Sequence, residues 1–249
     1  MGARRSGQAG KTGLASFLLF FGAAALAAAF SFSPMSLSLA PSGEGAIQSF
    51  RLTNPSTDTV AVKVSVVSRQ MDIDGVETLQ PADELFTVYP SRVVLRPNSV
   101  QVVKVQWKGP SDISVERNFR IVAEQVPVDF NGQKEGNIRI LLRYMGTLYV
   151  TPPDAMPNVV LDSLAPTTVS DHPALAVTLR NDGTAHVILD NLTLEVRGRG
   201  SSRKYSSDEL AGFSGENMLA GVKRTFVVPL PPELVGGDYS VAFHFDPLR

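Results

Sequence analysis

The sequence of 249 residues contains no cysteine. Disulfides, thiol catalysis and cysteine-ligated metal sites are therefore excluded, and the fold must be stabilised by its hydrophobic core alone. Histidine is also scarce, because His172, His186 and His244 are the only three and lie in separate segments. A copper or zinc site on a β-sheet protein needs several imidazoles that converge, so we predict no metal site.

Motifs of catalysis are missing as well. The chain has neither a glycine-rich phosphate loop nor the Gly-x-Ser-x-Gly motif of hydrolases. Glu116, Glu124 and Asp129 are scattered along one segment and do not form an acid–base pair. Asp72–Gly75 begins like a calcium loop but lacks the further acidic ligands, so we interpret it as a hairpin turn. The sequence predicts no enzyme activity and no cofactor.

The N-terminus has the three parts of a secretory signal peptide. Arg4, Arg5 and Lys11 precede an apolar run from Leu14 to about Ala29, which ends in small residues. A membrane anchor is the alternative, but this run is shorter than the roughly 20 residues that a spanning helix needs. We therefore assign residues 1–30 to a signal peptide, which predicts export and no membrane insertion after cleavage.

The remaining chain carries no excess of positive charge. Without the three basic residues of the leader, 20 basic residues face 24 acidic ones, a net charge of −4. This balance argues against nucleic acid as a partner, and no basic cluster indicates a membrane surface.

Alternation of apolar and polar residues predicts β-strands along nearly the whole chain after the leader. Val60, Val62, Val64 and Val66 give the clearest run. Seven such strands, separated by turn signals, precede residue 151. This pattern is typical of an immunoglobulin-like β-sandwich, which we assign to residues 31–150.

A proline-rich segment, residues 151–157, marks the expected domain boundary, since three of its seven residues are prolines. Alternation resumes in residues 158–249, where five to seven strands predict a second, smaller β-sandwich. The predicted fold class is all-β, with two immunoglobulin-like domains joined by a proline-rich linker.

The last strand of the first domain, residues 137–150, is unusually long. Ile138, Ile140 and Leu142 follow one another at a spacing of two, so they line one face of a strand. Such a strand can offer an aliphatic row and a hydrogen-bonding edge to another protein. The alternative is that these side chains pack in the chain's own core.

Several segments together resemble the periplasmic chaperones of the chaperone–usher pathway, the PapD-like family that assembles pili and fimbriae. The matching segments are Phe50–Pro55, Asp74–Val105, Glu116–Pro127 and Leu148–Pro152. The resemblance implies a periplasmic chaperone whose last first-domain strand completes the fold of a fibre subunit, by donor-strand complementation. Ile138, Ile140 and Leu142 would be the subunit-binding residues. Pilus or fibre subunits and an outer-membrane usher would be the partners, and the unloaded protein could hide its edge by self-association.

The chain departs from this family at the basic pair that holds the subunit's C-terminal carboxylate. Ser38 and Thr147 stand at the two positions, and neither can form a charge-assisted bond to a carboxylate. We therefore expect another cation to serve as the anchor. Arg143 is the first candidate because it shares a strand face with Thr147, and the further candidates are Arg139, Arg120 and Arg51. This departure suggests a divergent or archaic-type branch.

A second hypothesis does not involve chaperone activity. The chain could be a secreted tandem immunoglobulin-like module, an adhesin or fibre component, whose strands are all paired internally. The edge of the strand in residues 137–150 distinguishes the two, because a chaperone needs it open and an adhesin would bury it.

Overall fold

The computed structural model describes residues 30–128, 140–210 and 212–248. These residues are mostly strands, interrupted by three short 3-10 helices, η1 (Glu44–Ala46), η2 (Asp83–Leu85) and η3 (Pro232–Leu234). This confirms the predicted all-β class. No helix in the described residues is both long and apolar enough to cross a membrane. The predicted signal peptide lies outside the described residues, apart from its last residue.

The strands up to Val150 form two sheets. The first has the order β1 (Ser31–Ser33), β3 (Ile47–Asn54), β8 (Ser99–Trp107) and β6 (Phe86–Tyr89). The second has the order β2 (Ser36–Leu39), β10 (Arg143–Val150), β9 (Arg117–Val126), β4 (Val60–Met71) and β5 (Glu77–Pro81), with β7 (Arg92–Leu95) also paired to β4. The structure contains all seven expected strands and three further short ones, β1, β5 and β7, that the sequence pattern did not predict.

The core of this sandwich follows from the alternation read in the sequence. The even-numbered valines Val60 to Val66 of β4 are buried, and so are Phe50 and Leu52 of the facing sheet. Each such side chain contributes about 1.5–3 kcal/mol when it leaves water. The single tryptophan, Trp107, is buried beside Phe86 and Phe119 and therefore reports on the packing of this half.

The strands after the linker form two further sheets. One contains β11 (Val159–Val169), β12 (His172–Asn181) and β16 (Lys223–Pro229). In the other, β13 (Val187–Gly198) pairs with β14 (Ser201–Tyr205), β15 (Asn217–Met218) and β17 (Ser240–Leu248). Between the sheets lies a second core that includes Leu175, Leu189 and Phe226.

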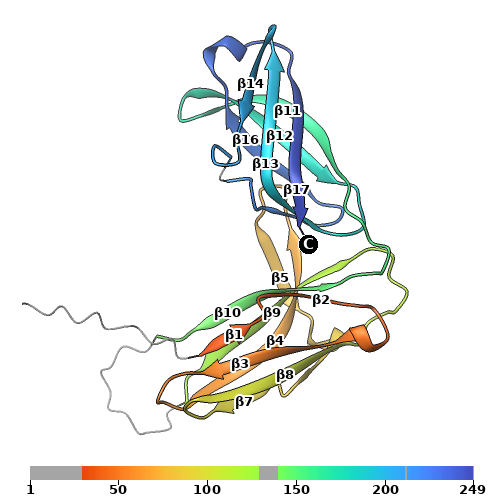
Figure 1. Cartoon of the computed structure of the whole chain (residues 1–249), viewed down its shortest axis with the longest axis vertical. Helices are drawn as coiled ribbons and strands as arrows, with labels where there is room; N and C mark the ends of the chain where they lie inside the picture. Colours follow the sequence, from red (N-terminus) through yellow and green to blue (C-terminus); the bar gives the residue numbers. More distant parts are fainter. Residues whose placement is uncertain (1–29, 129–139, 211, 249) are drawn as a thin grey trace, which may run out of the picture.

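The segment between the two halves is held against the second one. The backbone N–H of Thr184 donates to the carbonyl of Met156 at 2.7 Å, and that of Asp182 donates to the carbonyl of Asn158 at 2.8 Å. In Figure 1 the hairpin of β4 and β5 reaches from the first half toward the second. The junction is therefore built from the linker and from this hairpin.

Candidate functional site

Half of strand β10 has an unpaired edge. β10 pairs with β9 along its whole length, but its parallel partner β2 covers only Thr147–Val150. The N–H of Thr147 donates to the carbonyl of Met35 at 2.7 Å, so odd-numbered residues point their backbone groups away from β9. Because this direction alternates along a strand, Arg143 and Met145 present N–H and C=O groups to an edge that no strand of the described residues pairs with.

The apolar segment before β10 is largely exposed. Ile140 is 65% exposed and Leu141 47%, whereas Leu142 is half-buried and packs against the first core. Within the described residues the strand begins at Arg143, where the ladder with β9 ends, and residues 140–142 lie outside it. The Gln125 side chain accepts the Leu142 N–H at 3.4 Å. Ile138 lies outside the described residues.

On the strands that follow β10 in the sheet lies a pair of arginines that share one carboxylate, Arg120 on β9 and Arg69 on β4. Nη2 of Arg69 and Nη2 of Arg120 each lie 2.6 Å from Oε1 of Glu77. Arg120 also donates through Nε to Oε2 of Glu77 at 3.0 Å, and through Nη1 to Oγ1 of Thr147 at 2.6 Å. Arg120 is the cross-strand neighbour of Thr147 on β9, so a cation lies next to position 147.

Two positive charges and one negative charge give this cluster a net charge of +1. The side chain of Arg69 is only 3% exposed, and its Nε and Nη1 atoms have no hydrogen-bond partner in the described part of the chain. Burial pushes the pKa of the Glu77 carboxyl upward, but the hydrogen bond from Arg120 and the charges of Arg69 and Arg120 outweigh it. The pKa of Glu77 is therefore lower than usual, and its carboxyl is ionised at neutral pH.

The other expected anchor residues lie elsewhere. Arg143 is exposed and its Nε lies 3.9 Å from Oε2 of Glu124, a weak surface pair. Arg51 lies on β3, in the other sheet. Arg139 is outside the described residues. Of the candidates that the structure describes, Arg120 is the one that contacts Thr147. The sequence analysis missed its partners Arg69 and Glu77.

A buried polar cluster joins the two halves near the start of the linker. Oε1 of Glu116 accepts the backbone N–H of His186 at 3.1 Å and lies 2.8 Å from its Nδ1. Oε2 accepts the hydroxyl of Thr151 at 2.8 Å. The His186 ring stacks on Tyr149 with centroids 3.6 Å apart, and Asn217 donates to the Tyr149 hydroxyl at 2.6 Å. These contacts position β10 relative to the second half.

The β4–β5 hairpin supplies the second junction contact. The backbone N–H of Thr225 in β16 donates to the carbonyl of Ile73 at 2.9 Å. Arg224 donates to Sδ of Met71 at 3.4 Å and pairs with Glu216 at 3.0 Å. The hairpin tip thus attaches to the edge of a sheet in the second half, and the arginine cluster lies close to this tip, since Glu77 pairs with Met71 on the rung next to the turn.

Replacing Gly75 with alanine should loosen this attachment. Gly75 has φ +84°, and a Cβ placed there would lie 2.4 Å from the Arg224 guanidinium. We expect a loss of about 1–2 kcal/mol from backbone strain, plus the displacement of Arg224. Gly43→Ala is the matched control, since Gly43 has φ +72° and open space around it. Equal urea midpoints for the two variants would show that the Arg224 contact contributes nothing.

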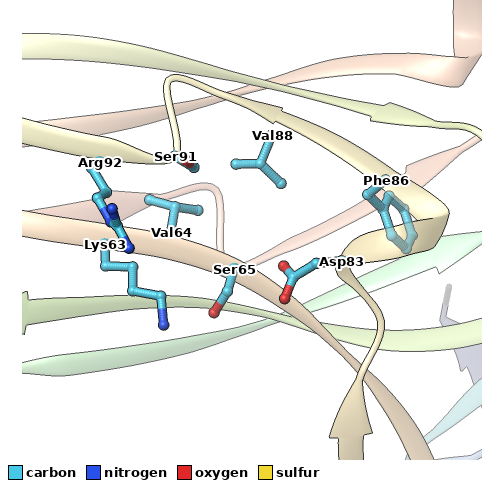
Figure 2. A pocket seen from close by; sticks show the side chains of 8 residues that line it. All are labelled: Lys63, Val64, Ser65, Asp83, Phe86, Val88, Ser91 and Arg92. Atoms are coloured by element: carbon cyan, nitrogen blue, oxygen red, sulfur yellow. The ribbon is translucent and has the colours of Figure 1, made fainter.

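A pocket of about 300 Å³ lies on the other edge of β4, where β5 and β7 leave a gap. Figure 2 shows Lys63 and Arg92 at one side of it and Asp83 at the other. Oδ1 of Asp83 accepts the backbone N–H of Val66 at 3.2 Å and so completes the strand edge. The described residues contain no group of three or more metal-ligating side chains.

No protein-family model matches the sequence, and no curated protein matches it. The fold does match solved structures. A chain of the chaperone–tip adhesin complex of CFA/I fimbriae biogenesis has a TM-score of 0.55 and 14% identity, over 86% of this chain and 98% of that one. The class 5 fimbriae chaperone CfaA has a TM-score of 0.54 and 13% identity, over 87% and 99%.

A third match is a chain of the CsuC–CsuE chaperone–tip adhesion subunit pre-assembly complex, from the archaic chaperone–usher Csu pili of Acinetobacter baumannii. Its TM-score is 0.53 at 10% identity, over 81% of this chain and 91% of that one. These similarities establish the fold, and they confirm at that level the resemblance stated from the sequence.

Proposed function

We propose that the protein is a periplasmic chaperone that binds fibre subunits by donor-strand complementation and delivers them to an outer-membrane usher. The observation that carries this proposal is the unpaired edge of β10 at Arg143 and Met145, which continues into the exposed Ile140. An unpaired edge beside exposed aliphatic side chains is an aggregation hazard in a protein that does not use it. In a strand-donating chaperone it is the binding surface.

The physical role of the donor segment is to complete an unfinished sandwich. A subunit that lacks one strand exposes an apolar groove and two strand edges. Ile138, Ile140 and Leu142 would fill the groove, and three such side chains contribute roughly 5–9 kcal/mol before ordering costs. Leu142 already packs on the chain's own core. Of the two donor residues that the structure describes, Ile140 therefore has more apolar surface to bury.

The structure also favours one carboxylate anchor among the candidates. Arg120 donates to the side chain of Thr147, the β10 residue at which the unpaired edge ends, and shares Glu77 with Arg69. A planar guanidinium suits bidentate binding of a carboxylate. We therefore propose that Arg120, supported by Arg69, binds the C-terminal carboxylate of the subunit, and that Arg143 does not.

The alternative of a tandem adhesin module is less well supported. Such a module would pair β10 internally along its length, whereas the described residues leave Arg143–Gly146 paired on one side only. The proposed role involves neither catalysis nor a cofactor, and it places the mature chain in the periplasm. Self-association of the unloaded protein would cover the same edge.

Replacing Arg120 with alanine tests the proposal. We expect a periplasmic pull-down of tagged wild type to recover a small β-rich partner in stoichiometric amount. Arg120→Ala should recover at least about 30-fold less, because truncating one partner of a buried charge pair typically costs about 2–5 kcal/mol. Arg143→Ala is the matched control and should behave like wild type, since Arg143 is exposed.

Trp107 fluorescence would check that both variants fold. An empty wild-type pull-down, or equal recovery by Arg120→Ala and wild type, would count against the proposed function or its anchor respectively. If only Arg143→Ala lost the partner, Arg143 and not Arg120 would be the carboxylate anchor.

A further inference from the structure

The carboxylate of Glu77 occupies the place where a ligand of the arginine pair would bind. It takes the Nε and Nη2 donors of Arg120 in a bidentate arrangement and bonds to Nη2 of Arg69 with the same Oε1 atom. This is the geometry in which guanidinium groups bind carboxylates most strongly. The pair is therefore already ligated by the chain itself.

Glu77 and Arg120 are the more exposed members of the cluster. Their side chains are 21% and 19% exposed, against 3% for Arg69. Glu77 is the first residue of β5, which pairs only with β4. Arg120 lies on β9, between two strands. An edge strand of five residues opens more readily than a central one. If one of the three groups leaves the cluster, Glu77 is the one that can do so at least cost.

The remaining donors show that the cluster is not fully satisfied. Two buried atoms of Arg69, Nε and Nη1, lack a partner among the described residues, and the net charge is +1. Buried donors without acceptors are unfavourable. A second carboxylate that approaches Arg69 and Arg120 would be attracted before Glu77 has left.

We propose that Glu77 is an internal carboxylate that occupies the arginine pair in the unloaded chain and gives way to the C-terminal carboxylate of a bound subunit. The substrate class in this inference rests on the proposed function. Exchange of one carboxylate for another leaves the charge of the site unchanged. The apparent affinity for the subunit carboxylate is the intrinsic affinity multiplied by the fraction of time that Glu77 is away from the pair, and release is assisted when Glu77 returns.

The test uses N-acetylvaline as a probe for a chain-terminal carboxylate and its primary amide as the control. Binding is followed by NMR of the arginine Nε–H groups at constant ionic strength. Wild type should bind N-acetylvaline about tenfold more weakly than Glu77→Gln, which keeps the size of the side chain but not its charge. The amide should bind to neither, and Arg120→Ala should bind neither probe.

Equal or weaker binding of N-acetylvaline by Glu77→Gln would overturn the proposal, since Glu77 would then position the arginines instead of competing for them. Absence of binding to both proteins would overturn it too, because the pair would not be an exchangeable carboxylate site. The titration needs no fibre subunit. An empty pull-down beside a positive titration would thus reject the chaperone function and keep the exchange at Glu77.

Discussion

Replacing Ile140 with aspartate should abolish the capture of fibre subunits while the chain itself folds normally. Ile140 is 65% exposed in the unloaded protein, so its loss removes little of the chain's own packing. In a donor strand the same side chain becomes buried in the subunit, where an isoleucine contributes about 1.5–3 kcal/mol and an unpaired carboxylate is strongly unfavourable. Recovery of the partner should fall about a hundredfold or more.

Leu141→Asp is the matched control for this experiment. Leu141 is 47% exposed and follows Ile140 directly. In an extended donor strand, neighbouring side chains point to opposite faces, so Leu141 would face away from the groove that Ile140 enters. We expect it to retain the partner, because only one face of a donor strand fills the groove. Equal retention by Ile140→Asp and wild type would falsify strand donation through this residue. Equal loss with both variants would show that the segment does not bind as a strand.

Replacing Glu116 with alanine should give the largest loss of stability. The Glu116 side chain is fully buried, and it accepts hydrogen bonds from the backbone of His186 and the hydroxyl of Thr151, besides contacting His186 Nδ1. Its removal leaves these buried groups without their acceptor. We expect a loss of about 3 kcal/mol, within the range for breaking buried polar pairs.

Urea unfolding followed by Trp107 fluorescence measures this loss in the first half, since the single tryptophan lies there. Thr151→Val removes one of the Glu116 contacts with little change of shape and should cost about 1 kcal/mol. X-ray scattering of Glu116→Ala would also show a wider range of orientations between the halves. A urea midpoint within error of wild type would mean that the junction does not depend on this cluster.

Local patterns were sufficient to predict the strands but not the contacts between them. The alternation Val60 to Val66 fixes both the strand and its buried face, because a period of two specifies which side chains share a face. The sequence placed residues 140–142 in this strand, whereas the observed strand begins at Arg143. The apolar pattern includes Ile140 and Leu142, but the ladder with β9 ends at Arg143. Hydrophobic spacing shows which residues can form a strand, and pairing decides where it stops.

The arginine cluster required knowledge of the strand register. Arg69 and Glu77 lie on two strands of one hairpin, and Arg120 reaches Glu77 across β4 from 43 residues away. The sequence placed Arg120 only among several alternatives, because an arginine on a strand is usually solvated. A signal was present in Arg69, an isolated cation at the end of an apolar strand. The partnership of Glu116 and His186, 70 residues apart, had no local signal.

Strand β2 gives the unpaired edge a defined end. It lies parallel against β10 from Thr147 onward, and the carbonyl of Met35 takes the N–H of Thr147. A foreign strand that adds to Arg143 and Met145 therefore runs into β2 and can go no further. Its last residue must stop before Thr147, whose edge β2 already occupies and whose side chain Arg120 contacts. In the proposed complex, this fixed stop would favour one register of the added strand over its neighbours.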